Sequence, residues 1–163
     1  MESHSSFLWS AAVLLLMLTS CVSVEERLNR QFDALPRIDS SLIYESSSEF
    51  SGATGRCKGT FLDRWYGTAL DAETVSKLYA DSFSEKGWVI WPEEVVEIWS
   101  LESNDGLYRA HLDVFADPTG ISQEQSSYRL SDSVFHELTQ YQTVFLLGMT
   151  YMSSSEAKKC YGK

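Results

Sequence analysis

The spacing of hydrophobic residues predicts one main amphipathic helix in this chain, over residues 71–86. Its apolar side chains recur at helical spacing and fall on one stripe, which contains Ala72, Val75, Leu78, Tyr79, Ser82 and Phe83. Asp71 can accept hydrogen bonds from the first amides of the helix, and Gly87 is placed for a left-handed C-cap. The stripe therefore predicts a helix that packs on another element through one face.

Two weaker patterns predict shorter helical segments. Residues 22–35 place Leu28, Phe32 and Leu35 on one helical face, and Pro36 ends the pattern. This segment, in which Ser23 and Glu26 have capping-box spacing, is expected to form a short helix or a tether. Later in the chain, Ser131 or Ser133 can cap a short helix that runs through Tyr141.

Continuous or alternating apolar runs predict five strands. They cover residues 41–44, 59–66, 88–102 with an interruption at Pro92, 107–116 and 143–152. The turn sequence Ser-Asn-Asp-Gly at 103–106 should join two of these strands into a hairpin. In residues 107–116 the side chains alternate: Tyr108, Ala110, Leu112, Val114 and Ala116 face one way, and Leu107, Arg109, His111, Asp113 and Phe115 face the other. This strand should have one buried face and one more polar face.

Together these elements predict an α+β fold. We expect two layers: a mostly antiparallel sheet of about five strands, with one main helix and a second short helix on one face of the sheet. Residues 46–55 are rich in Ser and Gly and are expected to form a loop, and the residues after Ser153 are expected to form a polar tail.

The N-terminal residues indicate export from the cytoplasm. The apolar run at 7–18, about 12 residues, is too short to span a membrane and fits the hydrophobic region of a secretory signal, although residues 1–6 contain no Lys or Arg. Leu18-Thr19-Ser20-Cys21 then resembles the lipobox of bacterial lipoproteins. The resemblance implies cleavage before Cys21, acylation of Cys21, and anchoring on the extracytoplasmic side of a bacterial envelope membrane. A plain cleaved signal and an uncleaved interfacial anchor are the alternatives.

With this resemblance, the chain divides into three parts. Residues 1–20 form the signal peptide, residues 21–35 the lipidated N-terminus with its tether or short helix, and residues 36–163 a single α+β domain. Acylation of Cys21 would leave Cys57 and Cys160 as an even pair in an oxidising compartment. We therefore expect a disulfide between Cys57 and Cys160.

The formal net charge of −10 restricts the partners of the domain. An acidic surface repels the phosphate backbone of nucleic acids and gains little from anionic lipid head groups. We expect no nucleic-acid binding. We also expect the acyl chains on Cys21, rather than surface charge, to hold the protein at the membrane.

A second resemblance concerns the main predicted helix and its flanks. Thr68-Ala69-Leu70-Asp71-Ala72-Glu73-Thr74-Val75, followed by Tyr79, Phe83 and Lys86-Gly87-Trp88, is similar to a pattern in small exported bacterial proteins, many of them lipoproteins of uncharacterised function. In those proteins a strand leads into a helix that ends in Gly-Trp before the next strand. The resemblance spans about residues 36–116. It implies the fold and brings no catalytic residue with it.

Arg109, His111 and Asp113 are the side chains on one strand face whose chemistry extends beyond packing. A His-x-Asp pair can ligate a metal or act in acid–base catalysis, and His136 or Glu137 could supply a third metal ligand. A solvated strand face explains the same pattern. Because the sequence also lacks a Gly-x-Ser-x-Gly nucleophile elbow, we assign no catalytic residue, metal or cofactor.

Trp88 and Trp91 are three residues apart in a predicted strand, so they should face opposite sides of the sheet. One of them could then be exposed and join Arg109, His111 and Asp113 in a binding surface, although core packing also explains both Trp residues. We therefore expect a non-catalytic, lipid-anchored envelope protein that binds another envelope protein. The alternatives are an anchored protein that binds a small molecule or a glycan, and a hydrolase or metal site near His111 and Asp113.

Overall fold

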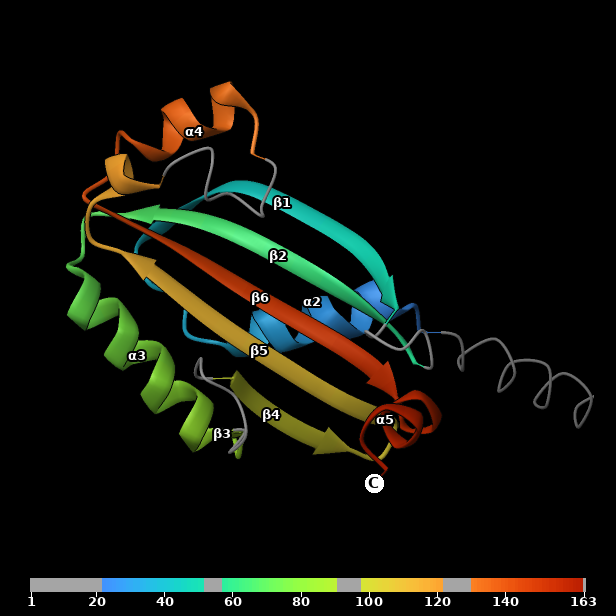
Figure 1. Ribbon diagram of the computed structural model, residues 1–163. Helices are drawn as coiled ribbons and strands as arrows, with labels where there is room; N and C mark the ends of the chain where they lie inside the picture. Colours follow the sequence, from blue (N-terminus) through green and yellow to red (C-terminus); the bar gives the residue numbers. More distant parts are fainter. Residues whose placement is uncertain (1–21, 52–56, 91–97, 122–129, 163) are drawn as a thin grey trace, which may run out of the picture.

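A computed structural model describes residues 22–51, 57–90, 98–121 and 130–162. Its centre is one antiparallel sheet with the strand order β1-β2-β6-β5-β4-β3 (Figure 1). The strands are β1 (Ser40–Ser51), β2 (Lys58–Thr68), β3 (Val89–Ile90), β4 (Ile98–Ser103), β5 (Gly106–Phe115) and β6 (Thr143–Ser153). The predicted α+β class with an antiparallel sheet is confirmed. The predicted 88–102 strand is instead two strands, because β3 pairs antiparallel with β4, and the sheet therefore has six strands.

Within the described residues, four α-helices pack against this sheet. They are α2 (Val24–Ala34), α3 (Ala72–Glu85), α4 (Asp132–Leu138) and α5 (Ser154–Tyr161), and a short 3-10 helix, η1, covers Pro118–Gly120. The predicted cap of the main helix is confirmed: the Asp71 carboxylate accepts a hydrogen bond from the amide of Thr74 at 2.8 Å. Gly87 follows α3 with a φ of 79°, which a residue without Cβ adopts at little energetic cost.

The helices lie on both faces of the sheet, which corrects the prediction that they share one face. On the first face, Leu28 and Phe32 of α2 and Val75, Tyr79 and Phe83 of α3 pack in one core cluster with Phe145 and Leu147 of β6. On the second face, Leu138 of α4 packs with Val144 and Leu146. Because successive side chains of a strand point to opposite sides, Leu146 and Leu147 belong to opposite faces. Of the two alternatives for residues 22–35, the structure has the helix, and its apolar side is part of the core.

Two predictions about loops are wrong. Residues 46–51 belong to β1, because the register with β2 continues from Ser46 opposite Asp63 to Ser51 opposite Lys58. The tail after Ser153 is the helix α5, whose first turn is capped by the Ser153 hydroxyl accepting from the amide of Glu156 at 3.4 Å. A local capping signal and long-range strand pairing thus supply structure where the sequence is only polar.

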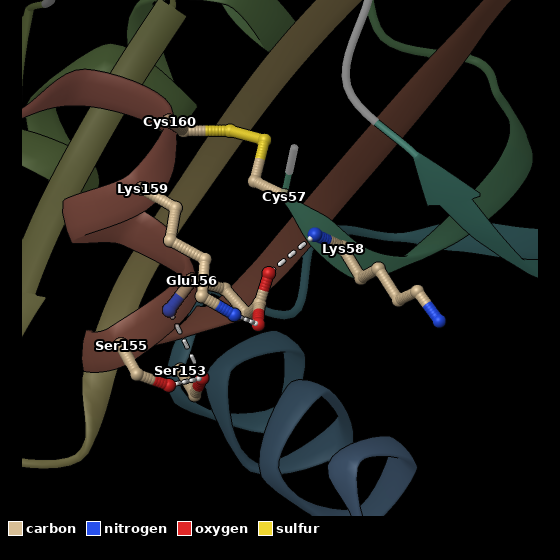
Figure 2. Close-up of polar contacts among 7 residues, drawn as sticks. All are labelled: Cys57, Lys58, Ser153, Ser155, Glu156, Lys159 and Cys160. Atoms are coloured by element: carbon tan, nitrogen blue, oxygen red, sulfur yellow. Dashed lines mark hydrogen bonds and ion pairs between the residues drawn. A yellow bond between two sulfur atoms is a disulfide. The ribbon is translucent and has the colours of Figure 1, made fainter. Parts of the chain in front are cut away.

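The predicted disulfide between Cys57 and Cys160 is confirmed, with 5.4 Å between the two Cα atoms. It joins the start of β2 to the last turn of α5 (Figure 2). Beside it, the Glu156 carboxylate accepts a hydrogen bond from the backbone amide of Lys58 at 2.8 Å and pairs with the ammonium group of Lys159. The disulfide and the hydrogen bond from the Lys58 amide therefore both attach α5 to the start of β2.

Candidate functional site

Among the described residues, two short helices cover the two ends of the second face of the sheet. At one end α4 packs over Trp65, Val144 and Leu146. At the other end α5 lies beside Leu107, and the Tyr161 hydroxyl accepts a hydrogen bond from the Arg109 guanidinium at 2.7 Å. Figure 1 shows α4 and α5 near opposite ends of β6. The middle of this face is the candidate site.

The antiparallel register aligns rows of second-face side chains across β2, β6 and β5. Between the two helices these rows are Phe61, Thr150 and Arg109; then Asp63, Gly148 and His111; then Trp65, Leu146 and Asp113. In the central row, a carboxylate and an imidazole flank a residue with no side chain. Strand pairing alone therefore places Asp63 and His111 together.

Gly148 lets Asp63 and His111 approach each other across β6. A Cβ on Gly148 would lie 2.5 Å from both the Asp63 Oδ1 and the His111 Nε2 atoms, so no larger residue fits between them. The distance between the Asp63 Oδ1 and His111 Nε2 atoms is therefore at most twice 2.5 Å. Glycine inside a strand often marks such a close approach, and here it brings an acid and a base into one row.

Asp63 is the electrostatically unusual group of this face. Its Oδ1 atom is buried and accepts no hydrogen bond from the residues that the structure describes. Burial raises the pKa of the Asp63 carboxyl above its ordinary value, the charge of His111 acts in the opposite direction, and the charge of Asp113 raises it further. A partly buried carboxylate oxygen without a protein donor is costly for the fold unless a solvent molecule or a ligand donates a hydrogen bond to it.

A hollow with a volume of about 420 Å³ lies over this part of the sheet. We call it the sheet groove; its lining residues are Phe50, Phe61, Asp63, Ile98, Arg109, Ala110, His111, Thr150, Met152 and Tyr161. The volume is within the range of roughly 300–1,000 Å³ that small-molecule sites occupy. Apolar side chains with a few convergent polar groups are also the usual lining of such sites.

The apolar part of the sheet groove lies toward the end of the sheet that carries α5. There Phe50 and Met152 meet over Gly59, since a Cβ on Gly59 would touch both side chains. Phe61 follows in the next row, and the polar row of Asp63 and His111 comes after it. On the β2 side, the groove therefore changes from apolar to polar along the strand, while Thr150 and Arg109 complete the row of Phe61 on β6 and β5.

The structure confirms the predicted alternation of β5, which places Arg109, His111 and Asp113 on one face. Arg109 and His111 line the groove, and Asp113 lies one row further, opposite Leu146. His136 and Glu137 are exposed on α4. In the described parts of the chain, no group of three or more His, Cys, Asp or Glu side chains is arranged to hold a metal ion.

Of the two explanations for Trp88, a binding surface or core packing, the structure supports core packing. Trp88 is only 3% exposed, and its ring lies edge-on to Phe83 with 5.2 Å between the ring centroids. Trp99 and Trp65 are buried as well. Trp91 lies outside the described residues, as does Cys21. The Trp residues in the described part of the chain thus stabilise the core and offer no binding surface.

The interpretation of the sequence missed Asp63, Phe61, Thr150 and Gly148 as site residues. Two local signals were present. Asp63 is a carboxylate between Phe61 and Trp65 on one face of a predicted strand, and Gly148 interrupts the most apolar strand of the chain. Neither signal identifies a site until the order of β2, β6 and β5 is known.

Comparison with protein-family models, with curated proteins and with solved structures found no match.

Proposed function

We propose that this chain is a lipid-anchored protein of the bacterial cell envelope that binds a small molecule in the sheet groove. The observation that carries the proposal is the row of Asp63, Gly148 and His111 in a hollow of about 420 Å³. The row places a carboxylate oxygen without a hydrogen-bond donor, among the described residues, beside an apolar wall. Such a combination suits the recognition of a ligand that has both apolar and polar parts.

The exposed hydrophobic residues favour a small ligand over a protein partner. Among the described residues, the large exposed hydrophobic side chains are Leu42, Leu78, Val89 and Ile90. Leu42 is on β1 and Val89 and Ile90 are on β3, which are the opposite edges of the sheet. Protein-docking sites usually present a contiguous apolar patch, and Leu42 is separated from Val89 and Ile90 by the width of the sheet.

Two observations support the envelope location: the disulfide and the lipobox-like sequence. The Cys57–Cys160 disulfide suits an oxidising compartment, and its formation leaves Cys21 as the third of the three Cys residues. Cys21 also ends the lipobox-like sequence. Within the described residues, no helix has the length and hydrophobicity needed to cross a membrane.

The position of α2 would fix how the anchored domain meets the membrane. Val22 and Ser23 are the residues between Cys21 and α2, and they span at most roughly 10 Å. Val24 shares a shallow hollow with Glu49 and Lys58, so α2 begins at the end of the sheet where β1 ends and β2 starts. The apolar part of the sheet groove lies at this same end, beside Gly59 near the start of β2. A ligand could therefore pass between the bilayer surface and the groove over a short distance.

Replacement of Cys21 by serine is expected to release the protein from the membrane fraction. Two or more acyl chains anchor a protein stably, whereas the acidic domain has little affinity of its own for the bilayer. Fractionation should find the wild-type chain in the membrane pellet until detergent is added, and the variant in the soluble fraction. Ser23→Thr, outside the lipobox-like sequence, is the matched control and should stay in the pellet. An unmodified N-terminal mass together with unchanged membrane retention of the Cys21→Ser variant would refute the lipid anchor.

Ligand binding is tested by co-purification. The protein purified from envelopes in mild detergent is expected to release a small molecule on denaturation, detectable by mass spectrometry. Phe61→Ala, which removes part of the apolar wall without adding an atom, should lower the released amount several-fold. Leu78→Ala on α3 is the matched control and should leave it unchanged. If the wild-type protein releases nothing, or both variants release the same amount as the wild type, the groove is not the ligand site.

A further inference from the structure

We propose that the sheet groove selects a cationic amphiphile: a small molecule with a short apolar chain and a protonated amine that donates to Asp63. This inference deepens the proposed function and depends on it. It rests on three features of the described residues: the unsatisfied oxygen of Asp63, the adjoining apolar wall, and the sign of the surrounding charge.

The unsatisfied oxygen determines what the ligand must supply. Oδ1 of Asp63 is buried and has no donor among the described residues, although the His111 Nε2 atom lies close to it across Gly148. A protonated amine carries up to three donors and a full positive charge. A hydrogen bond to an ionised carboxylate is about twice as strong as one between neutral groups, so an amine matches this oxygen better than a hydroxyl does.

The acidic groups at and beside the central row favour a cationic group at Asp63. Asp113 lies one row from Asp63, and the whole chain has a formal net charge of −10. The positive group of the groove, Arg109, already donates to the Tyr161 hydroxyl at 2.7 Å, and its guanidinium lies 5.6 Å from the centre of the Tyr161 ring. An anion bound at Asp63 itself would face that carboxylate directly, whereas an amine would be attracted by Asp63 and by Asp113. The charge of Arg109, one row away on the other side of the central row, acts in the opposite direction.

The apolar wall determines the other half of the ligand. Phe61 precedes Asp63 by two residues on β2, and two residues along a strand correspond to roughly 7 Å. An amine bound at Asp63 would thus project its apolar chain past Phe61 toward Phe50 and Met152. This is the end of the groove nearest the proposed anchor, where amphiphiles in the bilayer are at their highest local concentration.

Three probes with the same chain and different head groups test the inference: hexylamine, hexanol and hexanoate. The anchored protein, reconstituted in phosphatidylcholine nanodiscs, is titrated with each probe while NMR follows the imidazole resonances of His111. The anchored protein, cleaved before Cys21, keeps His111 and His136, so the signals are few enough to assign by substitution. All comparisons use the same nanodiscs, because each probe also partitions into lipid.

Hexylamine is expected to bind at least tenfold more tightly than hexanol or hexanoate. Asp63→Asn, which keeps the shape and removes the charge, should weaken hexylamine binding about tenfold or more and leave hexanol binding unchanged. Asp81→Asn, an exposed carboxylate on α3, is the matched control and should have no effect. Asp63→Asn should melt at least as high as the wild type, because it removes a partly buried charge whose pKa is raised.

Two results would overturn the inference and leave the proposed function standing. One is hexanol or hexanoate binding as tightly as hexylamine, with Phe61→Ala weakening that binding. The other is equal binding of hexylamine to the wild type and to Asp63→Asn. If none of the three probes shifts the His111 resonances, the cationic amphiphile is also rejected, and the co-purification experiment separately decides whether the groove binds any ligand.

Discussion

Replacing Cys57 and Cys160 together by alanine is expected to lower the free energy of unfolding by about 4 kcal/mol. The two residues are separated by 103 positions in the sequence, so the bond closes most of the domain into a loop. The chain-entropy model gives an upper value of about 4.7 kcal/mol for a loop of this length, and removal of a native disulfide from a small secreted domain commonly lowers stability by roughly 2–5 kcal/mol. For a single domain of this size, such a loss is a large part of the total stability.

The same double substitution should also weaken ligand binding. The disulfide holds the last turn of α5 against β2, and Tyr161 in that turn lines the sheet groove and bonds to Arg109. Without the disulfide, the described polar links of α5 to β2 and β5 would be the Glu156 contact to the Lys58 amide and the Arg109 contact to Tyr161. We therefore expect looser positioning of one wall of the groove in addition to the lower stability.

Urea denaturation of the wild type and the double variant, each with and without reductant, measures this effect. Reductant should lower the transition midpoint of the wild type to that of the variant and leave the midpoint of the variant unchanged. This comparison distinguishes the effect of losing the disulfide from any effect of the alanine side chains themselves. The prediction fails if the non-reduced wild type has two alkylatable thiols after unfolding. It also fails if reductant leaves the wild-type midpoint where it was.

Elements with strong local signals could be predicted from the sequence. In α3, the apolar stripe, the Asp71 cap and Gly87 all indicate the same helix, and the structure has Ala72–Glu85. In β5, a turn signal and clear alternation predict both the strand and its two faces. The helix α5 shows the opposite case, since Ser153 and Glu156 have capping-box spacing that was not recognised among polar residues.

The candidate site could be predicted only in part, because it depends on strand order. Arg109, His111 and Asp113 were placed on one face by the alternation of a single strand. Asp63 joins His111 only because β6, the last strand in the sequence, lies between β2 and β5. The second half of β1 also depends on non-local pairing, since its Ser-rich residues form a strand by pairing with β2 rather than through β propensity. Non-local pairing thus produces the groove, and no short segment of the sequence specifies it.

Phe83→Ala is expected to lower the free energy of unfolding by about 3–5 kcal/mol, the range for removal of a buried aromatic side chain. Phe83 has no exposed surface and joins α3 to the first face of the sheet. Its ring stacks on Trp99 with 5.4 Å between centroids and lies 5.2 Å from Trp88. The substitution would leave a cavity between two Trp rings, and these rings would lose both dispersion contacts and a fixed orientation.

Stability measurements check this prediction, and a binding experiment tests whether the two faces of the sheet act independently. Urea denaturation should show the lower stability, and near-ultraviolet circular dichroism should show weaker signals from Trp88 and Trp99. Leu78→Ala on the same helix is the matched control: Leu78 is 39% exposed, so its loss should change stability by less than about 1 kcal/mol.

Because Phe83 packs on the first face and the groove lies on the second, folded Phe83→Ala protein should bind hexylamine like the wild type. A stability loss below 1 kcal/mol would show that Phe83 is not the core contact described here, and loss of binding in the folded variant would show that the two faces do not act independently.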